Sequence, residues 1–222
     1  ALLAKPLSQA TVLVLGCGYN YSDVILYSNE VRRVEGLEVL NAFYRDGLRA
    51  TYRDLATRES RQLLAFLEAA SKQYHYRRYY RQLERVSGVV ATHSDLHLQS
   101  YAGDDKLPFN DDSFDVVLSN AVLEHVQDCD QVASELARIT RPGGITHHLW
   151  HNYYSFSGGH MPEAVCRQHP WGHLRGKYSK RGLNKLRPEQ VRAFFGQHFR
   201  VLDVHGVDGR HNKQGIDPEF EY

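Results

Sequence analysis

The stretch "TVLVLGCG" at residues 11–18 constrains the fold more than any other part of the sequence. Its first part, 11–16, is a continuous apolar run, which is typical of a parallel strand covered on both faces. Gly16 and Gly18 then form a turn of the kind that lets a ligand approach the backbone closely. The chain is therefore predicted to be built around a buried parallel sheet with a ligand at one edge.

Further strand-like runs alternate with helical stretches along the chain. The remaining strands are predicted at 33–39, 89–95, 114–119, 145–150 and 200–207. Helices are predicted at 21–33, at 127–140 before a Pro-Gly-Gly turn, and from Pro188 onward. This alternation predicts an α/β fold, a Rossmann-like doubly wound, mostly parallel sheet.

A helical insertion is predicted at about 40–86, between strands two and three. It is expected to break into two or three helices and to end at Gly88. Its apolar stripe at helical spacing is predicted to be Leu63, Leu67, Ala70 and Tyr74.

Length and composition favour one domain over 1–222, because 222 residues with 42% hydrophobic content form one full-sized core. A substrate-side loop is expected at about 151–186. The first residue is Ala rather than Met, which is consistent with a trimmed chain or with one domain of a longer protein.

Charge and cysteine content narrow the class of protein. The net charge of +1 gives no argument for nucleic-acid binding. No apolar run approaches the ~20 residues that span a bilayer, which predicts a soluble protein. Cys17, Cys129 and Cys166 are too scattered for a disulfide framework and are read as reduced thiols of a cytoplasmic protein.

The glycine turn excludes two common phosphate sites. The GxGxxG motif is incomplete, because Tyr21 occupies its third glycine position. The GxxxxGK[ST] motif is absent. Glu38, at the end of the second strand, is placed to accept hydrogen bonds from ribose hydroxyls. Asp95, at the predicted end of the third strand, is placed to meet an adenine amino group, although it would serve equally well as a helix cap. A nucleoside without phosphates fits this pattern, and S-adenosylmethionine is the common cofactor of that kind.

Four pieces of the sequence resemble class I S-adenosylmethionine-dependent methyltransferases of the small-molecule type, methyltransferase type 11-like. They are "VLVLGCG", "VEGLEV", "LPFNDDSFDVVLSNAVLEHV" and "ELARITRPGG", which occur in the family's order over roughly 11–150. The segment 151–205 is similar to the substrate side of methyltransferases from bacterial glycan and natural-product pathways.

This resemblance implies a set of cofactor-binding residues. Gly16, Cys17 and Gly18 would line the methionine part, Glu38 would hold the ribose, and the remaining contacts would come from Asp95, Leu96, Asn120 and Ala121. The chain departs from the family at Val14, where an acid is usual, and at Asn20, where glycine is common. Asparagine can adopt the left-handed conformation that glycine would supply.

Three histidines near strand ends are candidates for the base that methylation of a hydroxyl requires: His125, His151 and His160. Each can also be an ordinary hydrogen-bonded histidine. The stretch "HHLWH" raises a metal site as an alternative, but it has neither a helical HxxxH nor a paired carboxylate, so no metal is expected.

The acceptor is predicted to be a hydroxyl of a small molecule, a sugar or a natural product, in a pocket shaped by Tyr153, Tyr154 and Trp171. The basic and aromatic stretch 74–85 is either a solvated helix face with tyrosines in the core or part of a substrate wall. The rival hypothesis is a methyltransferase-like scaffold or binding domain without catalytic activity, which Val14 and Asn20 favour.

Overall fold

The computed structural model describes most of the chain, and its described residues are 3–39, 43–57, 60–89, 96–101, 106–178 and 182–206. They form two compact units. One consists of Ala1–Ser119 with Ile139–His147, and the other of Asn120–Arg138 with His148–Tyr222. The prediction of a single domain stays a prediction. Among the described residues, no helix combines the length and the apolar character that crossing a membrane requires.

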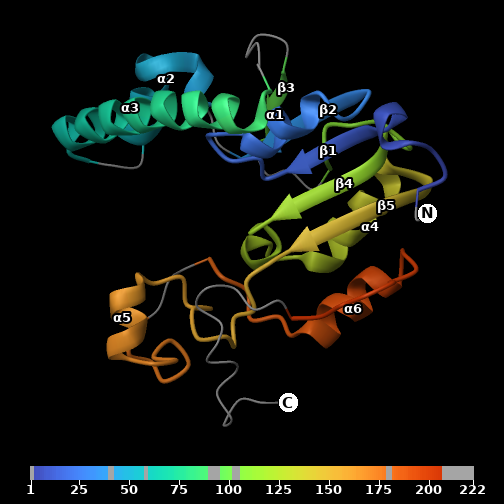
Figure 1. Ribbon diagram of the computed structural model, residues 1–222. Coiled ribbons are helices and arrows are strands. Elements are labelled where there is room, and N and C mark those ends of the chain that lie inside the picture. The colour runs from blue at the N-terminus through green and yellow to red at the C-terminus, as the bar shows by residue number, and fades with distance from the viewer. Residues whose placement is uncertain are drawn as a thin grey trace. The chain divides into compact units, whose positions relative to one another are not determined.

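The first unit contains a five-stranded sheet with the strand order β3-β2-β1-β4-β5. Its strands are β1 Thr11–Leu15, β2 Arg33–Glu38, β3 His97–Ser100, β4 Phe114–Asn120 and β5 Thr140–Leu149. β1 pairs in parallel with β2 and β4, and β2 pairs in parallel with β3. Figure 1 shows the arrows of β4 and β5 pointing the same way. The doubly wound parallel fold is confirmed, and the strand order reverses direction between β1 and β4, where such sheets bind their ligands.

The described helices and short 3-10 turns are η1 Leu7–Gln9, α1 Ser22–Ser28, η2 Tyr44–Asp46, α2 Gly47–Ala56, α3 Gln62–Ser87, η4 Leu123–His125, α4 Cys129–Ile139, α5 Glu163–Gln168 and α6 Pro188–Gly196. The helical insertion between β2 and β3 is confirmed as α2 and α3, which lie side by side in Figure 1. Gly88 ends α3 in a left-handed conformation, with φ of 69°. The helix from Pro188 is also confirmed.

One face of the sheet packs against α1 and the insertion. Val12, Val14 and Val34 belong to a buried cluster that also contains Val24 of α1 and Tyr80 of α3. This cluster lies directly below the glycine turn, so the core of the first unit supports the candidate cofactor site.

The buried face of α3 differs from the predicted stripe. Leu63 and Tyr74 are 70% and 61% exposed, whereas Ala65 and Ala69 are fully buried. Ala65 and Ala69 share a cluster with Leu55 of α2. Small side chains let two helices approach closely. The alanine face of α3 therefore packs against α2, although the leucine face has the same helical spacing.

Several predicted boundaries are wrong. β5 starts at Thr140, so the Pro-Gly-Gly segment lies inside the strand, where a side chain at Gly144 would come within 2.9 Å of the Asp115 carbonyl oxygen. β3 starts at His97, and the predicted strand at 89–95 falls mostly outside the described residues. Within 200–206 no strand is present. Leu202 there is 55% exposed. An alternating pattern alone does not make a strand, because the backbone groups of a strand also need a neighbouring strand as hydrogen-bond partner.

Asp115 is a structural residue, as expected of an acid inside a buried strand. Its Oδ2 accepts hydrogen bonds from the Thr11 N–H at 2.8 Å and from Arg141 at 2.9 Å, and its Oδ1 lies 2.7 Å from Lys5 Nζ. Burial works to raise the pKa of this carboxyl, but the bonds from Lys5, Thr11 and Arg141 outweigh it and leave the pKa below its ordinary value.

Candidate functional site

The glycine turn after β1 has the backbone geometry that its sequence predicts. Gly16 and Gly18 adopt φ angles of 69° and 68°, which glycine reaches at low cost. The N–H groups of Gly16 and Cys17 both donate to the Leu37 carbonyl of β2, at 2.8 and 3.2 Å. The turn is thereby fixed to the carboxyl end of β2, next to Glu38.

Glu38 holds its carboxylate against this turn. Its Oε2 accepts a hydrogen bond from the Gly18 N–H at 2.7 Å, and its Oε1 accepts one from the Val39 N–H at 2.8 Å. Each carboxylate oxygen has a second lone pair, and the side chain is only half-buried. This donor and acceptor set fits the two hydroxyls of a ribose, so the residues present fit the cofactor that the sequence predicts.

Close packing around the turn explains two more residue choices. A side chain at Gly36 would come within 2.9 Å of both Cys17 Sγ and a methyl group of Val24. Burial, followed by the negative charge of Glu38, raises the pKa of the Cys17 thiol to about 12. Cys17 is therefore a neutral packing residue in the turn and not a nucleophile.

The left-handed residue near the end of the turn is Tyr21, with φ of 36°, and not Asn20. Tyr21 is fully buried and its hydroxyl contacts the hydroxyl of Tyr76. The hydroxyl of Tyr80 contacts the Asn20 carbonyl. Packing of these rings holds a backbone conformation that a tyrosine rarely adopts.

The stretch 74–85 supplies part of this packing through Tyr76 and Tyr80, which are buried, whereas Tyr74 and Tyr79 are exposed. Beside them is a hollow of about 230 Å³, lined by Asn20, Ser71, Lys72, His75, Tyr76 and Tyr79. A substrate wall formed by this stretch stays a prediction.

Leu96 is buried in the core cluster below the turn, and its carbonyl accepts a hydrogen bond from Arg45 at 2.8 Å. Asp95 lies outside the described residues. Because β3 runs from His97 to Ser100, Asp95 precedes this strand rather than ending it. Contact of Asp95 with the adenine stays a prediction.

The end of β4 carries the other predicted cofactor residues. Ala121 has φ of 56°, a conformation that costs an alanine roughly 1–2 kcal/mol. Its N–H donates to the Leu149 carbonyl at 2.9 Å, which fixes the turn. Asn120 is exposed beside it. Contact of these two residues with the cofactor stays a prediction.

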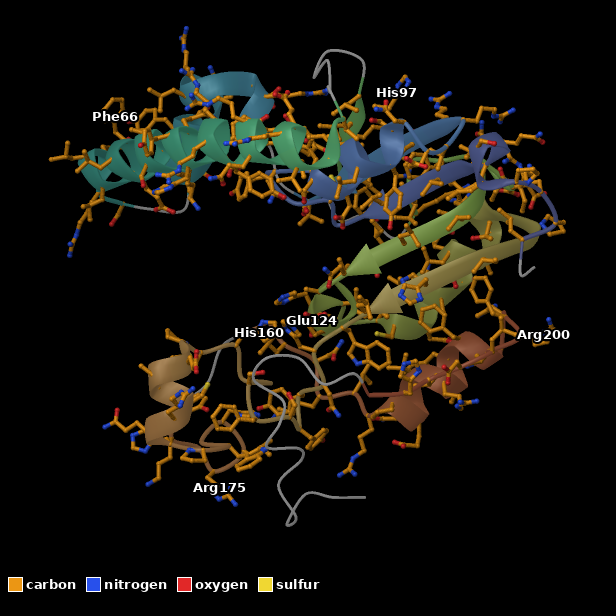
Figure 2. All side chains as sticks on the ribbon, viewed as in Figure 1. Phe66, His97, Glu124, His160, Arg175 and Arg200 are labelled. Atoms are coloured by element: carbon orange, nitrogen blue, oxygen red, sulfur yellow. The ribbon has the colours of Figure 1, made fainter. Side chains whose placement is uncertain are left out.

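The three predicted catalytic histidines gather in the second unit around one buried acid, Glu124. His151 Nδ1 lies 2.6 Å from His160 Nε2. Glu124 Oε1 lies 3.5 Å from His151 Nδ1 and 3.7 Å from His160 Nε2. The ring of His125 is 5.3 Å from that of His160. Figure 2 labels Glu124 and His160 at this cluster.

The side chains of the cluster differ in how far they are exposed. The side chain of Glu124 is 3% exposed, that of His160 is 12% exposed, and that of His151 is 56% exposed. Neither carboxylate oxygen of Glu124 has a hydrogen-bond partner among the described residues. A buried carboxylate without donors is costly, so this one calls for positive charge close by.

The chain positions Glu124 through η4 and a distant asparagine. The N–H of Asn184 donates to the Glu124 carbonyl at 2.8 Å, and its side-chain amide donates to the Val126 carbonyl at 2.8 Å. Asn184 therefore ties together the two ends of the short turn that carries Glu124 and His125.

Glycines position His160. A side chain at Gly158 would come within 2.5 Å of the carbonyl oxygens of Asn152 and Tyr153, and one at Gly159 would meet the ring of His173. His160 itself has φ of 52°. The tightly packed "SGGH" stretch therefore sets the direction of the His160 ring.

Glu124 and Asn184 are not among the residues predicted from the sequence. Glu124 stands in the quoted "LEHV", and a carboxylate directly before a candidate histidine was the signal that could have found it. Asn184 carries no local signal, because it lies 60 residues from Glu124 in the chain.

The predicted acceptor residues lie in two small clusters. Tyr153 and Tyr154 contact each other edge to face, and Arg187 lies over the Tyr154 ring at 4.7 Å. Trp171 instead packs against Phe156. Their role toward an acceptor stays a prediction.

Comparisons with known proteins show similarity to methyltransferases over part of the chain. A family model described as a methyltransferase domain matches residues 78–147. An uncharacterized methyltransferase of Mycolicibacterium vanbaalenii is 36% identical over 119 residues, which cover 53% of this chain and 46% of that protein. A demethylmenaquinone methyltransferase of Streptomyces avermitilis is 57% identical over 44 residues, 19% of each chain. The chain thus spans at most about half the length of these curated relatives.

Among solved structures, the YcgJ protein of Bacillus subtilis aligns with 18% identity and a TM-score of 0.48, over 88% of this chain and 63% of that one. This likeness is too low to carry an argument. The match of residues 78–147 to a methyltransferase domain, the parallel sheet and the Glu38-bound glycine turn agree with one another, and together they support an S-adenosylmethionine-dependent methyltransferase.

Proposed function

We propose that this protein transfers a methyl group from S-adenosylmethionine to a hydroxyl of a small-molecule, sugar or natural-product acceptor. The observation that carries the proposal is the hydrogen bond between the Gly18 N–H and Glu38 Oε2, at 2.7 Å. It sets an acid and a glycine turn at neighbouring strand ends, where a ribose needs them.

On the cofactor side, Gly16, Cys17 and Gly18 line the methionine part in this proposal, and Glu38 binds the ribose. Asn120 and Ala121 contact the cofactor beside its sulfonium. Leu96 contributes from the core below. Asp95 meets the adenine amino group in this proposal.

On the acceptor side, the histidine cluster handles the proton. The bound cofactor would supply a methyl group on a sulfonium, from which the neutral thioether S-adenosylhomocysteine leaves. His151 accepts the proton of the acceptor hydroxyl as the new oxygen–methyl bond forms. The support for His151 is its exposure together with the contact of its Nδ1 with His160 Nε2 at 2.6 Å.

Support for His160 and His125 comes from their place beside the same acid. They hold His151 and the acceptor in position in this proposal, and Tyr153, Tyr154 and Trp171 form the acceptor wall. We place the protein in the cytoplasm as part of the same proposal, because Cys17, Cys129 and Cys166 are free, buried thiols.

The first test is binding and turnover. Calorimetry with S-adenosylhomocysteine is expected to give a micromolar or tighter complex, and transfer of labelled methyl to a panel of sugars and phenols should identify the acceptor class. Absence of binding would favour the rival scaffold hypothesis, which Val14 and Asn20 support.

The second test separates the base from its neighbours. His151→Ala should lower the methyl-transfer rate at least 100-fold with cofactor affinity unchanged. His198→Ala, a change at another exposed histidine of the second unit, serves as the matched control. A near-normal rate in His151→Ala would exclude His151 as the base.

A further inference from the structure

The cluster around Glu124 has the donor set of a metal site. Glu124, His125 and His160 each offer one ligand atom, and these atoms all lie within 4.8 Å of one another. One carboxylate with two imidazoles suits divalent transition-metal ions such as zinc, whereas magnesium prefers oxygen ligands.

The distances are close to those of a bound ion. With bonds of about 2.1 Å, neighbouring ligands on a tetrahedral zinc ion lie about 3.4 Å apart. Glu124 Oε1 and His160 Nε2 are 3.7 Å apart. His125 is exposed, so its ring can turn to close the remaining distance. His151 Nδ1 is only 2.6 Å from His160 Nε2, too close for both atoms to bind one ion unless they separate.

The burial of Glu124 is the independent observation that points to a cation. Its side chain is 3% exposed and both oxygens lack a hydrogen-bond donor among the described residues. An ionised carboxylate is retained in such a place when it is paired or binds a metal. The nearest groups are imidazoles, whose neutral form is a metal ligand.

The protein also holds the ligands in place before any ion binds. Asn184 fixes the turn of Glu124 and His125 by two hydrogen bonds of 2.8 Å. The left-handed backbone of His160, with φ of 52°, is held by a hydrogen bond from its N–H to the Ser157 carbonyl at 2.9 Å. Supporting contacts of this kind orient metal ligands.

We infer that Glu124, His125 and His160 bind one divalent transition-metal ion of the zinc class. Three protein ligands leave a coordination position open, as in catalytic rather than structural zinc sites. Water or an acceptor hydroxyl takes that position, and His151 remains beside the ion. The role toward the acceptor rests on the proposed function, but binding of the ion does not.

The test is a metal titration of the full chain, freed of metal by a chelator, without cofactor or acceptor. Calorimetry with Zn²⁺ is expected to show one ion per chain with a micromolar or lower dissociation constant, and Mg²⁺ should give no heat. Glu124→Gln keeps the shape of the side chain and should weaken Zn²⁺ binding at least 10-fold. His198→Gln is the matched control and should bind as the wild type does.

Circular dichroism of the variants guards against misfolding, and His160→Gln gives a second, independent loss of a ligand. If the wild type binds no Zn²⁺, or if Glu124→Gln and His160→Gln both bind it as tightly as the wild type, the metal site is overturned. A parallel titration of the same wild-type sample with S-adenosylhomocysteine tests the proposed function separately, because Glu38 and the glycine turn contribute nothing to the proposed ion site.

Discussion

Glu38 and Glu124 are both glutamates near the end of a strand, yet their surroundings are opposite. Glu38 is half-buried and accepts a backbone N–H on each oxygen. Glu124 is buried, lacks any donor among the described residues, and lies within 3.7 Å of two histidine nitrogens. A carboxylate that already accepts directed hydrogen bonds can extend them to hydroxyls. A buried carboxylate without donors instead requires a cation.

The difference shows that the type of residue does not settle the type of site. Backbone donors at the carboxyl end of β2 make Glu38 a group for binding hydroxyls. Imidazoles gathered from distant parts of the chain make Glu124 a group for binding positive charge. Four variants test this contrast.

The largest effect is expected from Glu38→Ala. Loss of two charge-assisted hydrogen bonds should weaken S-adenosylhomocysteine binding about 100-fold, or about 2.7 kcal/mol. Calorimetry measures this loss, and Glu68→Ala on α3, an exposed acid paired with Lys72, is the control. A change of less than threefold would contradict the ribose assignment.

Asp115→Asn provides a reference for a carboxylate that is both buried and fully paired. It should lower the free energy of unfolding by about 2 kcal/mol, since one member of a buried ion-pair network is removed. Chemical denaturation at pH 7 measures this loss.

The pH dependence of that loss follows from the direction of the Asp115 pKa, which is lowered in the folded protein. A lowered pKa stabilises the fold above the unfolded value of about 4 and loses this contribution as pH falls through the folded value. The gap between Asp115→Asn and the wild type should therefore narrow below about pH 4. A gap that stays constant in acid would contradict the pairing.

Glu124→Gln should have the opposite sign. In metal-free protein, replacing a buried charge that lacks donors is expected to raise the free energy of unfolding by about 1–2 kcal/mol. Added Zn²⁺ should stabilise the wild type more than the variant, because the wild type binds the ion more tightly. Thermal unfolding with and without the ion measures both effects, and a destabilised metal-free variant would show that Glu124 has a structural partner.

Asn184→Ala should have the smallest effect, a loss of about 1 kcal/mol in unfolding free energy for its side-chain hydrogen bonds. It should also weaken Zn²⁺ binding, because the turn that carries Glu124 loosens, while S-adenosylhomocysteine binding stays unchanged. Unchanged Zn²⁺ affinity would separate Asn184 from the site.

Sequence patterns were sufficient wherever the determinants are local. An apolar run ending in two glycines predicted β1 and its turn, and the second strand-like run predicted the position of Glu38 at the neighbouring strand end. Parallel pairing makes this reliable, because β1 and β2 end side by side, with Leu15 opposite Leu37. The insertion, the cap at Gly88 and the helix from Pro188 followed from equally local signals.

Tertiary structure decided the choices between equivalent patterns. On α3, Leu63 and Ala65 both belong to helical stripes, and packing against α2 buried the alanine. Near strand three, the apolar character of 89–95 did not reveal the strand that starts at His97.

By itself, then, the sequence determined the parallel sheet, the glycine turn and the place of Glu38, since neighbouring residues and strand ends encode them. Only the tertiary structure assembled Glu124, His160 and Asn184. His160 lies 36 positions after Glu124 in the chain, and Asn184 lies 60 positions after it. No periodicity links the three residues. Their meeting depends on tight glycine packing and on hydrogen bonds between distant segments, which form only when the chain has folded.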